Sequence, residues 1–449
     1  MRALIIGAGN AGSNLAVKLC EERHDVVIID RNRPALADLE SQLDVLTVAG
    51  HGCSPAVLEE AEIRKAHLVV AVTSSDEVNI LACTQAAAAG VRYKVARIAG
   101  ADYLRENSIF SLAGAGVDLA VNPREECAKD ILNNLTLPGS QEVIDLLGGR
   151  VLAVGAKVAA GSPLLKTTLE DFPRPDLLQT IRFIAVLRDN DLIIPRGDTS
   201  FSIGDEIYVV GQPAEIPAFL DWASPNRPHI DRIVIAGSGP VGMKLAASLE
   251  TDRRPVVVIE PDEESANRCA AALNRATVLR SNPTSEETLA EVGITENTAF
   301  IASMESEEHN IIASLVARKQ GAGMTVSQVT DPQYVPIINS LNTLDRAVST
   351  HLSMINAILH FIRGRQIESA SVMHMLPGEL LEVVLTTRTP WTGKEIRTLR
   401  IPGGAIIATV LRSDTICPPT GDLRLQEGDR LVIFSNPRAL KKLNAIFRR

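Results

Sequence analysis

The chain repeats one sequence pattern twice, and this repeat constrains its fold more than any other feature. The segment ALIIGAGNAGSNLA (residues 3–16) matches RIVIAGSGPVGMKLA (residues 232–246), and the three glycines of each copy lie 230 residues apart. The acidic residues that end the next apolar run, Asp30 and Glu260, keep the same separation. Repetition at a fixed spacing indicates repeated structural units, so we expect two homologous halves.

A second, smaller unit is also repeated. IIPRGDTSFSIGDEIYVVG (residues 193–211) matches ICPPTGDLRLQEGDRLVIFS (residues 416–435), and its Gly-Asp pairs are typical of tight turns between short strands. The first pattern instead alternates apolar strands with helices, as in a parallel, doubly wound sheet. We therefore predict an α/β fold of two tandem Rossmann-like domains, each followed by a small α+β domain rich in strands. Turn-forming residues place these domains at residues 1–137, 141–223, 231–363 and 367–449.

Composition narrows the class of protein. The 449 residues are 45% hydrophobic and 22% charged, as in chains that bury their own cores. The sequence shows no apolar run of about 18 residues and no secretory leader, so we expect a cytoplasmic protein without direct membrane insertion. A net charge of -9 argues against nucleic-acid binding and against attraction to anionic lipid. Six scattered cysteines suggest neither disulfides nor zinc.

The first glycine motif predicts a nucleotide site. Gly7 permits the tight turn from strand to helix, Gly9 lets the backbone approach a pyrophosphate, and Gly12 lets the helix pack on the strand. Asp30 ends the following strand, where a carboxylate can bind the two ribose hydroxyls of an adenosine. An acid at this position favours NAD(H) over its 2'-phosphorylated form, although the neighbouring Arg31 weakens that preference.

Other first-half candidates lie where strands are expected to end. Such carboxyl ends line the ligand crevice of a parallel sheet. For Thr73 and Ser74 the alternative is an ordinary helix cap, because two acidic residues follow at 76 and 77. Together with the turn glycines and Asp30, the candidates are Ala8, Asn10, Ala11, Arg31, His51, Gly52, Thr73, Ser74 and Arg97.

The second copy keeps its glycines but changes downstream. The run GHGCS (residues 50–54) becomes RSNPT (residues 280–284), and Gln328 lies in the region that corresponds to Arg97. A nucleotide site and a role in packing alone both remain open for this copy. Its candidate residues are Gly237, Ser238, Gly239, Pro240, Val241, Gly242 and Glu260.

Motifs for catalysis are missing from the sequence. The eight histidines form no dyad or metal pair by spacing, and neither a metalloprotease nor a hydrolase motif occurs. A nicotinamide-dependent dehydrogenase with duplicated cofactor domains is the rival hypothesis, and it would require a proton-transferring group and a larger substrate domain. A structural tether without ligand control is a third alternative.

These motifs together resemble a known family. LIIGAGNAGSNLA, Asp30, VAGHGCS, VVAVTSSDEVNILAC and ARI, followed by a second copy and two Gly-Asp units, resemble the TrkA family of potassium-uptake regulators. The resemblance implies tandem regulator-of-potassium-conductance (RCK) domains that bind NAD(H), and in related members ATP or ADP. It also implies a homotetrameric ring that lies on the inner face of the membrane beneath a potassium channel of the TrkH or TrkG type.

The resemblance carries over residue by residue. In the first half it covers residues 7–12, Asp30, His51, Gly52, Thr73, Ser74 and Arg97, and in the second half residues 237–242 and Glu260. The sequence departs from the family pattern at residues 280–281 and 304–306, which bears on the second nucleotide site. A ligand shifts an equilibrium only through its different affinities for two states, so we expect the nucleotide to act as a signal and not as a reactant.

Overall fold

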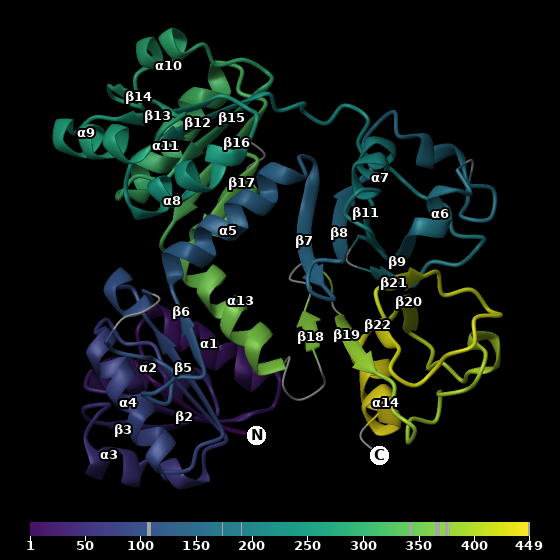
Figure 1. Cartoon of the computed structure of the whole chain (residues 1–449), viewed down its shortest axis with the longest axis horizontal. Coiled ribbons are helices and arrows are strands. Elements are labelled where there is room, and N and C mark those ends of the chain that lie inside the picture. Colours follow the sequence, from purple (N-terminus) through teal and green to yellow (C-terminus); the bar gives the residue numbers. More distant parts are fainter. Residues whose placement is uncertain are drawn as a thin grey trace. The chain divides into compact units, whose positions relative to one another are not determined.

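The computed structural model describes residues 1–105, 109–172, 174–189, 191–340, 344–363, 369–372, 376 and 378–447. Contacts divide the chain into two compact units, coloured along the sequence in Figure 1. The first unit combines Met1–Leu132 with Ile230–Leu359, and the second combines Asn133–His229 with His360–Arg449. Each unit therefore contains one domain type from both halves of the repeat.

The first Rossmann-like domain is a six-stranded parallel sheet in the order β3-β2-β1-β4-β5-β6. Its central strands read as continuous apolar runs because both faces are buried, as in a sheet covered by helices on both sides. Its elements are β1 Arg2–Ile6, α1 Asn10–Glu21, β2 Asp25–Asp30, α2 Arg33–Gln42, β3 Leu46–Ala49, α3 Pro55–Glu60, η1 Ile63–Lys65, β4 Leu68–Ala71, α4 Asp76–Ala88, β5 Tyr93–Arg97, η2 Ala101–Leu104, β6 Leu119–Val121 and α5 Pro123–Thr136.

The second Rossmann-like domain has the same topology, with strand order β14-β13-β12-β15-β16-β17 and every pair parallel. Its elements are β12 Arg232–Ala236, α8 Pro240–Ser248, η4 Leu249–Thr251, β13 Val256–Glu260, α9 Glu263–Ala272, β14 Thr277–Arg280, α10 Glu286–Val292, β15 Thr298–Ala302, α11 Glu307–Lys319, β16 Met324–Val329, α12 Tyr334–Ser340, β17 Arg346–Ser349 and α13 Thr350–Arg363. The two doubly wound sheets confirm the predicted α/β class.

The small domains are five-stranded antiparallel sheets ordered β10-β9-β11-β8-β7 and β18-β19-β22-β20-β21. The first contains β7 Ser140–Leu146, β8 Val151–Lys157, η3 Pro163–Lys166, α6 Leu177–Thr180, β9 Ile181–Arg188, β10 Asp191–Ile193, β11 Glu206–Gly211 and α7 Ile216–Ala223. The second contains β18 Ser369–Val372, β19 Glu379–Val384, η5 Ile396–Thr398, β20 Ala405–Arg412, β21 Thr415–Cys417, β22 Arg430–Ser435 and α14 Pro437–Phe447. They confirm the predicted α+β domains.

The second unit has a core that both small domains share. One cluster of buried side chains includes Leu146, Tyr208 and Val210 from the first half together with Leu380 and Phe434 from the second. Separate cores lie under each small domain and on a face of each Rossmann-like sheet. The two small domains of this unit thus bury apolar side chains against each other.

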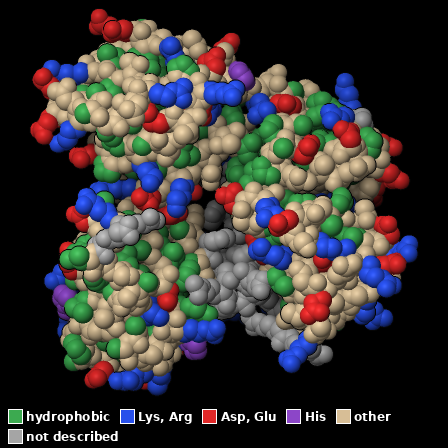
Figure 2. Space-filling model, in the orientation of Figure 1, with side chains coloured by type: hydrophobic (Ala, Val, Ile, Leu, Met, Phe, Trp, Pro, Cys, Tyr) green, Lys and Arg blue, Asp and Glu red, His purple; other side chains and the backbone are tan. Residues whose placement is uncertain are grey.

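The surface carries charges of both signs. Figure 2 shows acidic and basic side chains interspersed with apolar ones on the face that is drawn. Among the described residues, no helix has both the length and the apolar character that crossing a lipid bilayer requires.

Candidate nucleotide site

The turn between β1 and α1 is shaped by two glycines that the backbone requires. Gly7 has a φ of +111°, which is unfavourable for other residues. A Cβ atom on Gly12 would lie 1.8 Å from the carbonyl oxygen of Gly7. Both residues therefore serve the tight strand-to-helix turn, as the sequence predicts.

Gly9 has a different role. A Cβ atom on Gly9 would meet no heavy atom within 4 Å, so the fold itself leaves this position open. Gly9 directly precedes α1 as its N-cap residue, with no side chain to cap it. The N–H groups of the first helical turn have no acceptors within the helix and carry partial positive charge, so an anion is stabilised here.

Asp30 lies next to this turn at the end of β2. One carboxylate oxygen accepts the N–H of Ala8 at 2.6 Å, and the other accepts the N–H of Asn32 at 2.8 Å. A carboxylate offers about four lone-pair positions, which leaves room for two more hydrogen bonds. These positions suit the two hydroxyls of a ribose, whereas the side chain of Arg31 is exposed.

The loop that contains His51 and Gly52 packs on β1. A Cβ atom on Gly52 would lie 2.2 Å from a methyl carbon of Ile6, so packing requires glycine here. His51 is exposed, and its Nδ1 accepts the N–H of Cys53 at 3.2 Å. The structure thus gives Gly52 a packing role and leaves the ring of His51 at the surface.

The segment after β4 forms a helix cap. The hydroxyl of Ser75 accepts the N–H of Val78 at 3.2 Å and caps α4, and two acidic residues follow in the first turn. Thr73 donates its hydroxyl hydrogen to Oδ1 of Asn79 at 2.8 Å, and Ser74 is exposed. Ser75 therefore provides the helix cap, and Thr73 is held at the carboxyl end of the sheet.

Arg97 brings a positive charge to the same edge. Its Nη1 donates to the carbonyl of Thr73 at 2.9 Å, and burial lowers the pKa of its guanidinium. Nearby Asp76 raises this pKa, whereas Arg124 lowers it further. Within the described part of the chain, Arg97 makes no ion pair, so its charge remains available to an anion.

Two further residues at this edge were not predicted from the sequence as site residues. Asn79 is fully buried and its Nδ2 donates to the carbonyls of Thr73 and Arg97, which ties the ends of β4 and β5 together. The repeat aligns it with Asn310, which makes the same bonds in the second copy. Arg124 is the second such residue, because its charge acts on Arg97. In the sequence it could have been found from its position in the first turn of α5, directly after the last strand of the sheet.

The second copy forms the same turn with other surroundings. Gly237 has a φ of +99°, and a Cβ atom on Gly242 would lie 2.0 Å from the oxygen of Gly237. Glu260 accepts both the N–H and the hydroxyl of Ser238 through one oxygen, at 2.7 and 2.8 Å. Pro240 is the first residue of α8, and Val241 is buried behind it.

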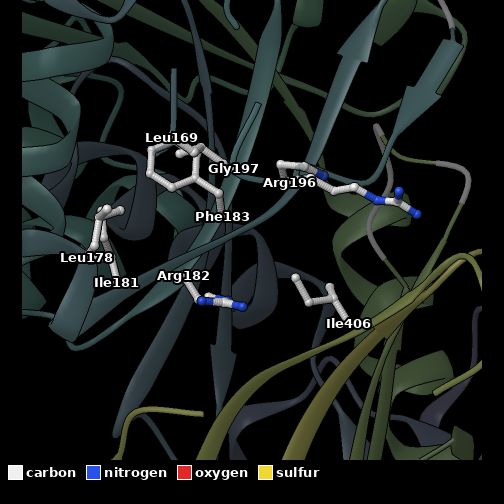
Figure 3. Close-up of a pocket in the computed structure, with 9 residues that line it drawn as sticks. Leu169, Leu178, Ile181, Arg182, Phe183, Arg196, Gly197 and Ile406 are labelled. Atoms are coloured by element: carbon white, nitrogen blue, oxygen red, sulfur yellow. The ribbon is translucent and has the colours of Figure 1, made fainter. Parts of the chain in front are cut away.

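A separate hollow of about 170 Å³ occurs in the second unit. Figure 3 shows its apolar lining, which includes Phe183 and Ile406, with the side chains of Arg182 and Arg196 beside it. Ligand pockets usually measure about 300–1,000 Å³, so this hollow is too small for a whole dinucleotide. None of the candidate residues from the sequence lies in it.

The carboxyl-end edge of the first Rossmann-like sheet, here named the first cleft, brings together three groups of the kinds that a dinucleotide requires. It combines an open glycine at a helix N-terminus, free acceptor positions on Asp30 and the unpaired cation of Arg97. These groups suit a pyrophosphate, a ribose and a further negative charge, respectively. The cleft lies at the carboxyl ends of β1 and β4, where the strand order reverses.

Comparison with protein families matches both domain types twice. The TrkA-N domain matches residues 3–123 and 233–350, and the TrkA-C domain matches residues 153–224 and 380–448. The chain belongs to the TrkA family. This membership accounts for the predicted repeat and for the α/β architecture of tandem RCK type.

Curated relatives span the whole chain. The Trk system potassium uptake protein TrkA of Halomonas elongata is 29% identical over 453 residues, which cover 100% of this chain and 98% of that protein. A TrkA homologue of Methanosarcina mazei, homologue 1, is 30% identical over 458 residues and is covered completely, as is this chain.

Solved structures share the fold. The GsuK channel bound to NAD aligns with a TM-score of 0.60 and 19% identity, covering 100% of this chain and 79% of that one. The GsuK RCK domain aligns with a TM-score of 0.59 and 19% identity, covering 95% of that chain. At this level of identity the likeness concerns the fold.

Proposed function

We propose that this TrkA-family protein is a regulatory subunit of a Trk-type potassium-uptake system, and that a nucleotide bound in the first Rossmann-like cleft controls a membrane potassium channel. Support for the system comes from relatives named as potassium-uptake proteins over the whole chain. The observation that carries the nucleotide role is the open position at Gly9 beside the free acceptors of Asp30.

NAD(H) is the proposed ligand, with ATP and ADP as alternatives that share the adenosine and phosphate groups. Asp30 would accept the ribose hydroxyls, and the first turn of α1, from Asn10 and Ala11 to Gly12, would face the pyrophosphate. Arg97 would neutralise negative charge at the far side of the cleft, near Thr73. A structural neighbour that binds NAD supports this assignment.

The partner we propose is a channel subunit of the TrkH or TrkG type, contacted by a homotetramer on the cytoplasmic face of the membrane. Family membership and the alignment with the GsuK channel support a membrane partner and an oligomer. A ring of chains would offer two conformational states that the nucleotide stabilises to different extents. The difference between the nucleotide's affinities for the two states would determine how strongly the channel responds.

A nicotinamide-dependent dehydrogenase is the less favoured alternative. It would need a proton-transferring group at the nicotinamide, and the exposed His51 uses its Nδ1 to accept a backbone N–H. Whole-chain similarity to potassium-uptake proteins also favours regulation over turnover. We therefore expect the bound nucleotide to be recovered unchanged.

The test is a calorimetric titration of the purified protein with NADH, NAD, ATP and ADP, together with Asp30→Ala. We expect saturable binding by the wild type and its loss in the variant, because the ribose acceptor is gone. Asp44→Ala is the matched control, since it removes an exposed carboxylate of the same domain that lies outside the candidate site. Absence of binding by all four nucleotides, or steady oxidation of NADH, would refute the proposal.

A further inference from the structure

The two Rossmann-like copies differ at the four places where a dinucleotide would be held. From these differences we infer that each chain binds one nucleotide, in the first cleft, and that the second cleft is closed to dinucleotides by its own side chains. This inference rests on the proposed function of the first cleft. The residues that decide it are Ser238, Pro240, Met304 and Gln328.

The acidic residue of the second cleft is already occupied. Glu260 accepts three hydrogen bonds, from the N–H and hydroxyl of Ser238 and from the N–H of Asp262 at 3.0 Å. Among the described residues Asp30 accepts two, from the N–H groups of Ala8 and Asn32, because Ala8 stands where the second copy has Ser238. With about four lone-pair positions per carboxylate, Glu260 cannot accept two ribose hydroxyls. The hydroxyl of Ser238 thus takes a place that the first copy leaves to a ligand.

The helix N-terminus of the second cleft has lost a donor. Pro240 begins α8 where Asn10 begins α1, and proline has no N–H group. A pyrophosphate at this terminus would therefore find one fewer hydrogen-bond donor than in the first cleft. Proline stabilises the first turn of the helix, so the exchange favours folding at the expense of anion binding.

A methionine narrows the space above the second glycine turn. Met304 occupies the position of Thr73, since Asn310 accepts its N–H as Asn79 accepts that of Thr73. The Cγ of Met304 lies 2.9 Å from the point where a Cβ on Gly237 would be. The side chain of Met304 thus lies against the turn at the position where the first copy has the smaller side chain of Thr73.

The positive charge of the first cleft is absent from the second. Gln328 stands where Arg97 stands, since Nδ2 of Asn310 donates to its carbonyl as Nδ2 of Asn79 donates to that of Arg97. Its Oε1 is buried without a hydrogen-bond partner among the described residues. The second copy therefore lacks the guanidinium that the first copy places at the end of this strand, where it would meet a phosphate group.

The decisive experiment counts NADH molecules per chain by calorimetry. We expect one for the wild type, none for Asp30→Ala and one for Glu260→Gln. Any binding to the second cleft should be about a hundredfold weaker or more, since each lost charge-assisted hydrogen bond lowers affinity roughly ten- to a hundredfold.

A designed variant tests the cause. Ser238→Ala, Pro240→Asn, Met304→Thr and Gln328→Arg together should raise the count to two, and adding Asp30→Ala should leave one. Binding of NADH to the unchanged first cleft shows in the same sample that the variant is folded. Two molecules per wild-type chain, or a count that stays at one in the folded four-residue variant, would overturn this inference. No binding by the wild type would instead overturn the proposed function.

Discussion

At the scale of single residues, the glycines of the first turn separate folding from binding. Gly9 has open space where the methyl group of an alanine would lie, whereas Gly12 lies against the carbonyl of Gly7. Two substitutions to alanine in the same motif should therefore have opposite consequences. This contrast makes the motif a sensitive test of the proposed site.

We expect Gly9→Ala to fold normally and to lose most of its affinity for NADH, because the methyl group would occupy the place of the pyrophosphate. The measurement is thermal unfolding beside a calorimetric titration. Gly12→Ala should instead lower the unfolding temperature strongly, because its Cβ would lie 1.8 Å from a backbone oxygen. If Gly9→Ala binds NADH like the wild type, the pyrophosphate does not lie at this turn.

The sequence predicts the residues of this cleft well where backbone geometry is involved. GxGxxG after a strand specifies the turn, and the acid that follows the second strand is Asp30, as expected. It predicts poorly where side chains bond to their own backbone. Ser238 on Glu260 and Asn79 between two strands depend on distances across the sheet that no local pattern contains.

At the scale of elements, the two small domains share an equivalent ion pair between an arginine and a buried aspartate. Asp205 is 2% exposed and accepts two bonds from Arg188, at 2.8 and 2.7 Å, and its second-half equivalent Asp429 does the same with Arg412. The sequence shows two Gly-Asp pairs per unit without distinguishing them. Only burial reveals that the second aspartate of each unit, and not Asp198, holds the strands.

Asp205→Ala should therefore destabilise the protein by about 3 kcal/mol, because it leaves the guanidinium of Arg188 without its partner and frees the N–H of Ser202. Asp198→Ala, at the exposed Gly-Asp pair, should change stability by less than about 0.5 kcal/mol. Urea unfolding measures both. Equal effects of the two substitutions would contradict a special role for the buried pair.

Helices α5 and α13 contain a titratable contact within the first unit. Burial raises the pKa of Asp130 to about 6, and nearby Glu126 raises it too, whereas a hydrogen bond from Ser353 and the charge of Lys129 lower it. The unfolded chain releases this proton near pH 4. The folded state binds the proton more tightly, so this contribution to stability is complete below pH 4 and is lost as pH rises through 6.

Asp130→Asn should remove this pH dependence and stabilise the protein above pH 7 by about 3 kcal/mol. Unfolding temperatures at pH 5 and pH 8 test this expectation as a difference between variant and wild type. Asp44→Asn, at an exposed position of the same unit, is the control. A variant that follows the wild type at both pH values would exclude a raised pKa.

At the scale of the whole molecule, the repeat predicts which domains exist but not how they are combined. The two halves are successive in sequence, yet each compact unit takes one domain type from both. The shared core of the small domains unites side chains that are more than 200 residues apart, such as Leu146 and Phe434. Burial between residues so far apart in sequence cannot be predicted from hydrophobic periodicity or turn residues, because these patterns report on local structure only.

A half-chain of residues 1–229 should therefore not remain a simple monomer. Its small domain would expose the apolar side chains that Leu380 and Phe434 cover, and the N–H of Leu147 would lose the carboxylate of Glu382. Light scattering after size exclusion should show self-association or aggregation. Adding residues 230–449 should restore a defined complex, and a monomeric half-chain with native unfolding behaviour would contradict the shared core.

The repeated sheet with one open cleft has a consequence for signalling. The two copies share one strand order, so without a ligand the chain contains two sheets of equivalent topology. A nucleotide that enters only the copy with Gly9 and Asp30 breaks this equivalence. Binding then makes the two Rossmann-like domains of one chain differ. The signal that the chain transmits is this difference between a nucleotide-bound and a nucleotide-free domain.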